Sequence, residues 1–317
     1  MSKPNMRGAI FSSNSVPPIS TLRRERRFYF LLCFTATTVL SFGTAHAQDE
    51  SAFHELETKY IFGNFTVGSS PGIEGEKAFE TENEANFGKR SGRYGAGITE
   101  LELEYTPTQY MQVEFGPTLS YYNIQGVPGL ADGNFGGANG FEADLRSLLI
   151  DRGPSPFAVT FSIEPEFHSL DETTGAQVWN AGLETKIEAD AELIKNRVFL
   201  AFNLLYEPEG TNPVSGSWDT ESTLGVSSAL AFQIIPNVVV GADLWYLRHW
   251  DGLGFNTLTG DAVYLGPTLF WQIAPKVLLS AAFETQIAGH EFGPTPLALD
   301  LTDFSRQRAR LLLEFEF

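Results

Sequence analysis

Carboxylates make up most of the side chains in this sequence that could do chemistry, and they recur at every second position of short segments. In "GLETKIEADAEL", Glu184, Lys186, Glu188 and Asp190 alternate with apolar residues such as Leu183 and Ile187. Side chains two residues apart lie on the same face of a β-strand. Grouped acids of this kind select cations in channels. The pattern therefore predicts strands with one acidic face and one apolar face.

The same alternation recurs along the chain after residue 54. The segments "ITELELEY", "MQVEFGPTLSYY" and "FAVTFSIEPEFH" each place apolar residues on one face and polar residues on the other. Counting such segments predicts an all-β chain with strands at about 55–67, 94–106, 109–122, 140–151, 156–168, 179–193, 197–207, 220–235, 238–249, 262–273, 276–288 and 304–317.

The connections between these segments alternate in length. Short turns such as "TPTQ", "RGPSP" and "IKN" contain the residues typical of turns. Longer stretches rich in Gly, Asn, Ser and Asp separate them, at 68–93, 123–139, 169–178, 208–219, 250–261 and 289–303. We therefore expect antiparallel strands whose tight turns all lie at one end and whose long loops all lie at the other.

The N-terminus has the features of a secretory signal peptide. Arginines at 23, 24, 26 and 27 precede an apolar run over 28–42, and "AHA" follows at 45–47. We assign 1–47 as a signal peptide cleaved after Ala47, and 48–317 as the mature domain. The only cysteine, Cys33, lies inside the apolar run, so the mature chain needs no disulfide.

Composition excludes several classes of protein. Removing residues 1–47 leaves 15 basic and 38 acidic residues, a net charge of −23, which disfavours nucleic acid as a partner. No stretch after Ala47 has the roughly 18 apolar residues of a transmembrane helix. If the protein crosses a membrane, it must do so with strands.

The mature chain resembles a Gram-negative outer-membrane β-barrel. That family has an even number of strands, short periplasmic turns and long outer loops. The C-terminal segment "RARLLLEFEF" also resembles the family's assembly signal, with Phe317 as the terminal aromatic, Phe315 two residues before it and Arg310 at the polar position. Leu312 stands where the family usually has glycine.

The resemblance implies a closed antiparallel up-and-down transmembrane β-barrel of about 12 strands in the cell outer membrane, with both termini in the periplasm. It also implies two partners, outer-membrane lipid and the barrel assembly machinery. The positions of aromatic residues agree with a membrane-spanning barrel, because they form two predicted bands, one near the turns and one near the loops. The bands comprise Tyr105, Tyr110, Phe157, Phe199 and Trp271, and Tyr121, Phe167, Trp179, Tyr206, Trp218, Tyr246 and Trp250.

In such a barrel the polar face lines the lumen, because charged side chains are costly on the lipid face. The predicted lumen-lining charges are Glu100, Glu102, Glu104, Glu114, Asp144, Arg146, Glu164, Glu184, Lys186, Glu188, Asp190, Asp243, Glu284, Arg308 and Arg310. They would form either a narrow conduit for cations or a packed network that supports the wall. Inward apolar residues in the second half, including Phe199, Leu205, Trp245 and Phe270, indicate either packing or a path for hydrophobic solutes.

An enzyme is the other class to consider, because some outer-membrane barrels are hydrolases. A lipase needs a histidine within reach of a serine, yet His168, His249 and His290 lack the His-x-x-Asn-Gly context of the outer-membrane phospholipase. We expect no enzyme, no catalytic residue, no metal and no cofactor. The sequence thus favours a narrow channel or transporter for small solutes, with a structural barrel and a hydrolase as the alternatives.

Overall fold

The computed structural model describes residues 56, 59–62, 65–153, 155–213, 216–293 and 296–317. The predicted signal peptide and its cleavage site lie outside these residues. The strands are β1 Lys77–Phe87, β2 Arg93–Thr108, β3 Met111–Gln125, β4 Gly133–Ile150, β5 Ala158–Leu170, β6 Gln177–Ile194, β7 Val198–Pro213, β8 Asp219–Ile235, β9 Val238–Asp251, β10 Thr257–Ala274, β11 Val277–Glu291, β12 Leu297–Ala298 and β13 Gln307–Glu316.

Twelve of these strands form one closed antiparallel sheet. Consecutive strands from β1 to β11 pair with each other, and β13 pairs with both β11 and β1, which closes the barrel. The two-residue strand β12 pairs only with β11. The predicted fold class, a closed barrel of about twelve strands, is therefore confirmed.

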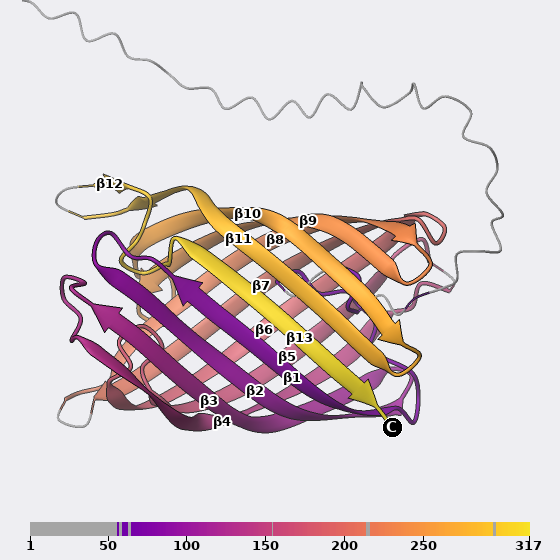
Figure 1. Ribbon diagram of the computed structural model, residues 1–317, viewed down its shortest axis with the longest axis horizontal. Coiled ribbons are helices and arrows are strands. Elements are labelled where there is room, and N and C mark those ends of the chain that lie inside the picture. The colour runs from indigo at the N-terminus through magenta and orange to yellow at the C-terminus, as the bar shows by residue number, and fades with distance from the viewer. Residues whose placement is uncertain (1–55, 57–58, 63–64, 154, 214–215, 294–295) are drawn as a thin grey trace, which may run out of the picture. The chain divides into compact units, whose positions relative to one another are not determined.

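The two ends of the barrel differ. At the turn end lie the short connections β2–β3, β4–β5, β6–β7, β8–β9 and β10–β11 and the C-terminus, whereas β12 lies at the opposite, loop end (Figure 1). The strands run obliquely between the two ends, as closure of a barrel requires (Figure 1).

Apolar side chains cover the outside of the barrel. On β3, Phe115 and Leu119 are 45% and 42% exposed, whereas the alternate residues Glu114 and Thr118 are 7% and 1% exposed. Acids inside and aromatics outside invert the arrangement of a water-soluble protein, and this inversion suits a barrel surrounded by lipid. Among the described residues, no helix is long and apolar enough to cross a membrane.

The prediction for the first strand was wrong. The described part of 55–67 contains no strand, and the strand that pairs with β13 is β1, within the stretch predicted as the first long loop. Alternating hydrophobicity does not reveal β1, because its outward face includes the polar residues Thr81 and Asn83 between Phe79 and Phe87. The wall still has twelve strands, because β1 takes the position that was predicted for a strand at 55–67.

The first five long loops are also shorter than predicted, and the last keeps its predicted length. The connections at the loop end span 88–92, 126–132, 171–176, 214–218, 252–256 and 292–306. The glycine-rich stretch from Gly133 to Asn139, predicted as loop, forms the start of β4. Backbone pairing with β3 extends this strand although its side chains carry little hydrophobic signal.

Two aromatic residues depart from the predicted bands. Phe199 is 3% exposed and Trp250 is 8% exposed, so neither contributes to the outer surface. Residues near both ends are exposed as expected, including Tyr110 and Trp271 at the turn end and Trp179 and Trp218 at the loop end. The two bands remain, with fewer members.

Inward-facing glycines allow neighbouring strands to approach in the middle of the wall. An ideal Cβ at Gly266 would lie 1.9 Å from the Phe283 carbonyl oxygen, and one at Gly116 would lie 2.0 Å from the Leu101 carbonyl oxygen. No atom lies within 4 Å of the same position at Gly137 on β4.

We predict that Gly266→Ala lowers the free energy of unfolding by about 1–3 kcal/mol, because the new methyl group must displace backbone. Gly137→Ala is the matched control and should leave stability unchanged. Urea unfolding of the refolded barrel in detergent measures both. Equal midpoints for the two variants would contradict the close approach at Gly266.

Candidate functional site in the barrel lumen

The N-terminal segment before β1 lies inside the barrel. Leu56, Tyr60, Ile61 and Phe62 are at most 7% exposed. They belong to one apolar cluster with inward residues of the wall, namely Phe199, Ala201, Ala229, Ala231, Val239, Phe270, Leu278 and Leu312. We call the described residues 56, 59–62 and 65–69 the lumenal segment. The inward apolar residues of the second half of the chain thus pack against it, which answers the question that the sequence left open.

Polar side chains of the wall bind the backbone of the lumenal segment. Thr66 N and Oγ1 donate to Asp243, with N to Oδ2 at 2.9 Å, and Val67 N donates to Asn203 Oδ1 at 2.8 Å. Ser69 N donates to Asp190 Oδ2 at 2.7 Å, and Arg146 Nη2 donates to the Gly68 carbonyl at 2.8 Å. Four strands therefore hold one extended piece of chain.

A buried ion cluster fixes the start of the segment. Lys59 Nζ lies 2.7 Å from Glu104 Oε2 and 2.9 Å from Glu114 Oε1, and its side chain is 2% exposed. Tyr60 Oη donates to Glu104 Oε2 at 3.1 Å. Removing Lys59 would leave two buried carboxylates without their cation, and an unpaired buried charge is strongly destabilising.

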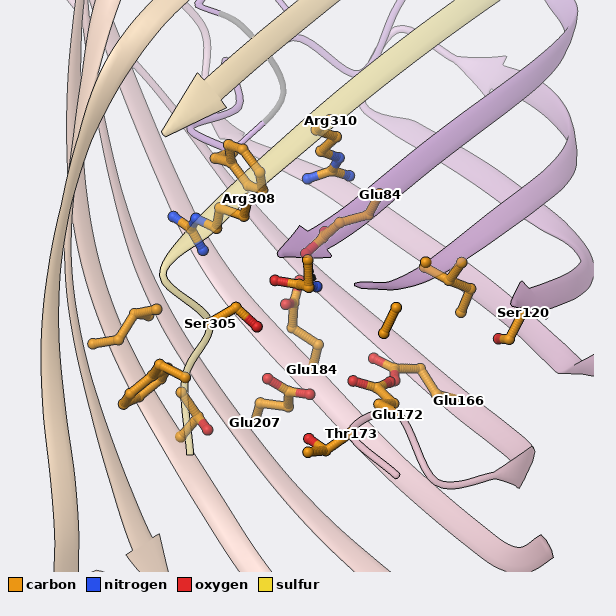
Figure 2. A pocket seen from close by; sticks show the side chains of 18 of the residues that line it. Glu84, Ser120, Glu166, Glu172, Thr173, Glu184, Glu207, Ser305, Arg308 and Arg310 are labelled. Atoms are coloured by element: carbon orange, nitrogen blue, oxygen red, sulfur yellow. Dashed lines mark hydrogen bonds between the residues drawn. The ribbon is translucent and has the colours of Figure 1, made fainter. Parts of the chain in front are cut away.

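A cavity of about 320 Å³ occupies the lumen on the loop side of this segment. Ten carboxylates and only four basic side chains line it. Figure 2 shows the carboxylates of Glu166, Glu184 and Glu207 reaching into this space, while Arg308 and Arg310 extend from β13. Aromatic and aliphatic residues form another part of the lining: Phe65, Leu205, Trp245, Leu247, Tyr264 and Phe304.

Three of the four bases are paired with acids. Arg308 Nε donates to Glu284 Oε2 at 2.6 Å, Arg310 pairs with Glu82, and Lys186 pairs with Glu184. The Arg308 guanidinium also stacks within 4.0 Å of the Phe65 ring centroid. Six acids of the lining form no ion pair with the described residues: Glu84, Glu100, Glu164, Glu166, Glu207 and Asp303. Acidic side chains therefore outnumber basic ones around the cavity.

The predicted lumen-lining residues fall into two sets, one fully buried and one that lines the cavity. The buried set consists of Glu102, Glu104, Glu114, Asp144, Arg146, Glu188, Asp190, Asp243 and Glu284. The set that lines the cavity consists of Glu100, Glu164, Glu184, Lys186, Arg308 and Arg310. In the predicted assembly signal, Phe315 and Phe317 are 41% and 69% exposed.

Sequence reasoning missed part of this lining. Glu82 and Glu84 belong to β1, whose segment was assigned to a loop, and Glu172 lies between β5 and β6. The spacing of Glu80, Glu82 and Glu84 at every second position was the available signal. This acidic spacing is a weak signal for a strand, because the residues on the opposite face of β1 are only partly apolar.

The connection between β11 and β13 folds over the loop side of the lumen. Leu301 and Ser305 are 7% and 6% exposed, and Phe304 packs against the cluster around Trp245. Lys89 Nζ donates to the carbonyls of Thr302 and Phe304 at 2.9 and 3.0 Å. We call residues 299–306 the cap segment.

Two titratable groups at the cap have shifted pKa values. Burial lowers the pKa of Lys89 to about 8, although Asp300 and Asp303 oppose the shift. Burial, together with the nearby Asp303, raises the pKa of Asp300 to about 7. Asp300 Oδ1 accepts hydrogen bonds from Thr302 N and Asp303 N, both at 3.1 Å, so this side chain holds the turn of the cap.

The three described histidines contact acids. His168 Nε2 lies 2.7 Å from Glu142 Oε1, and His290 Nδ1 lies 3.3 Å from Asp261 Oδ1. His249 lies 3.2 Å from both Glu221 Oε2 and Thr223 Oγ1. These contacts join no histidine to a serine, the pair that a serine lipase requires. Thr223 faces the cavity, away from membrane lipid.

Comparisons with known proteins agree with the fold. A family described as "Family of unknown function (DUF6662)" matches residues 55–317. No functionally curated protein matches the chain. The barrel is similar to the COG4313 outer membrane channel from Pseudomonas putida F1, with 12% identity and a TM-score of 0.53 over 78% of this chain and 98% of that one.

Two further solved structures are similar at lower TM-scores. The NanC porin is 8% identical with a TM-score of 0.44, covering 75% of this chain and all of that one. LpxR from Salmonella typhimurium is 10% identical with a TM-score of 0.43, covering 76% of this chain and all of that one. At 12% identity, the similarity to the Pseudomonas putida channel shows the barrel fold alone.

The cap should loosen as the pH rises from about 4 to about 7. Because the pKa of Asp300 is raised to about 7, the folded state binds more protons than the unfolded state in this range, so the stabilisation falls with pH. Hydrogen exchange of residues 299–306 measures this effect. Asp300→Asn should flatten the dependence, whereas Asp219→Asn, at an exposed site, should retain it. A wild-type cap with no change over this range would contradict the assignment.

Proposed function

The chain belongs to the DUF6662 family, and we propose that it forms an outer-membrane channel for small cationic solutes, closed in this conformation by its own lumenal segment. The observation that carries the proposal is the division of the lumen. A cavity with surplus carboxylates lies on the loop side, and a non-covalently held segment fills the turn side.

The acidic cavity supports cations as the solutes. Because the nearby bases pair with other acids, Glu164, Glu166 and Glu207 are available to contact a solute in the cavity. Rings of acidic side chains favour cations in channels because they replace part of the hydration shell and lower the local potential energy. The similar fold of an outer-membrane channel is compatible with this function.

The mode of attachment supports a displaceable segment. Its contacts with the wall are separate side-chain hydrogen bonds and ion pairs, such as those from Thr66 to Asp243 and from Lys59 to Glu104, and each hydrogen bond contributes a net stabilisation of about 0.5–3 kcal/mol. The wall strands pair with one another and not with this segment. The segment can therefore leave without opening the barrel.

The proposed setting follows from the outer surface. We infer that the exposed apolar band contacts outer-membrane lipid and that the turn end faces the periplasm, as in other barrels with short periplasmic turns. The exposed Phe315 and Phe317 would then be available to the barrel assembly machinery.

A structural barrel is the second candidate, because the apolar cluster between wall and lumenal segment is extensive. In that case the segment would never leave. Conductance experiments with the segment locked and unlocked separate the two functions.

We predict that a disulfide between segment and wall abolishes conductance. Thr66 Oγ1 and Ser227 Oγ lie 2.7 Å apart, so Thr66→Cys with Ser227→Cys should join them, and the mature chain is predicted to have no other cysteine. In planar bilayers the oxidised double variant should be silent, and reduction should restore the openings of the wild type.

Each single cysteine variant is the control and should conduct with or without reductant. Conductance by the oxidised double variant would show that this segment is not the gate. Silence of the wild type and of the reduced variant, with intact β-sheet circular dichroism, would favour the structural barrel.

We further predict that the unpaired cavity acids set selectivity. The triple variant Glu164→Gln, Glu166→Gln and Glu207→Gln should move the reversal potential under a KCl gradient toward zero, because it removes three negative charges. Glu74→Gln, an exposed residue at the turn end, is the matched control. An unchanged reversal potential in the triple variant would exclude the cavity as the selectivity site.

A further inference from the structure

Two glutamates that line the cavity and a neighbouring buried histidine converge on the inner wall of the barrel. Glu142 on β4 pairs directly with Glu166 on β5, and His168 lies two residues further along β5. All three face the lumen, and one ligand atom from each lies within 4.8 Å of the others. The strand pairing thus brings three potential metal ligands together from two strands.

The imidazole has the orientation of a metal ligand. His168 is 4% exposed, and its Nε2 lies 2.7 Å from Glu142 Oε1. Its other nitrogen, Nδ1, makes no hydrogen bond within the described part of the chain, and Glu172 Oε1 lies 3.5 Å from it. Histidines that bind metals usually present one nitrogen to the ion and the other to a carboxylate.

The backbone leaves room for this orientation. The residue opposite His168 on β4 is Gly140, and a Cβ there would lie 2.8 Å from His168 Cδ2. A side chain at 140 would therefore force the imidazole to move. Glycine at this position lets the ring lean toward Glu142.

The third ligand is available. Glu166 is half-buried and has no hydrogen-bond or ion-pair partner among the residues that the structure describes. Its carboxylate points into the cavity (Figure 2), as does that of Glu172. A divalent cation would neutralise charge that the nearby bases leave uncompensated.

We propose that Glu142, Glu166 and His168 form a binding site for a divalent transition-metal ion of the zinc type. One imidazole nitrogen and two carboxylates suit such an ion, whereas calcium and magnesium prefer oxygen ligands alone. Two ligands of a tetrahedral zinc ion with bonds of about 2.0 Å lie about 3.3 Å apart. The present 2.7 Å between His168 Nε2 and Glu142 Oε1 requires only a small opening.

This site does not depend on conduction by the barrel, because its ligands come from the wall and not from the lumenal segment. The test is titration of the full mature protein in detergent with Co²⁺, followed by its visible absorption, and with Zn²⁺, followed by calorimetry. We expect one ion per chain, with Zn²⁺ displacing Co²⁺.

The variants separate ligation from general electrostatics. Glu166→Gln, which leaves the buried pair of Glu142 and His168 intact, should weaken binding at least tenfold. His168→Ala should abolish the one-to-one step. Glu207→Gln removes a charge from the same cavity and should weaken binding less than Glu166→Gln does. His290→Ala, at an exposed histidine outside the cavity lining, should have no effect.

Two outcomes would overturn the proposal. One is the absence of a one-to-one step in the wild type, in which case Glu142 and His168 form an ion pair only. The other is equal weakening by Glu166→Gln and Glu207→Gln, which would indicate diffuse attraction of cations to the cavity. If His168→Ala fails to fold, Glu166→Gln alone decides.

Discussion

The pairing of β13 with β1 is the interaction on which the rest of the structure depends. A sheet with an apolar outer face cannot leave an edge in lipid, because unpaired backbone groups there have no water to bind. Ten register pairs between Ala78–Phe87 and Gln307–Glu316 remove that edge. This closure also creates an enclosed lumen whose contents decide the function.

The two ends of the enclosed lumen are filled in different ways. On the turn side, apolar residues of β7 to β11 meet the apolar lumenal segment, and buried acids meet Lys59 and Arg146. On the loop side, the acids outnumber the bases and space remains. The turn side of the lumen is packed like a protein core, and the loop side contains a cavity. A barrel that only supported itself would have little reason to leave unpaired carboxylates around a cavity, since buried charges are costly without partners.

The predicted strands succeeded and failed for identifiable reasons. From β2 onward, strong alternation of apolar and polar residues located every strand of the wall, with errors mainly at the loop end, where glycine-rich β4 begins. The segment 55–67 was misassigned because apolar residues at alternate positions indicate burial but not the surface against which they are buried. Tyr60 and Phe62 are buried inside the barrel and not on its outer face. Tyr60 and Phe62 pack against the inward-facing Phe199 and Phe270 of the wall. The sequence alone does not show that these distant residues meet.

By itself the sequence determined the architecture: an all-β closed barrel, about twelve strands, acids inside, apolar residues outside and a C-terminal strand that needs a partner. These features follow from period-two patterning and turn residues, which are local. Only the tertiary structure decided which segment closes the barrel, that the lumenal segment fills the turn side, and that Glu142, Glu166 and His168 meet. These features depend on strand register and on contacts between residues far apart in the chain, such as Thr66 with Asp243, and local patterns carry no information on either.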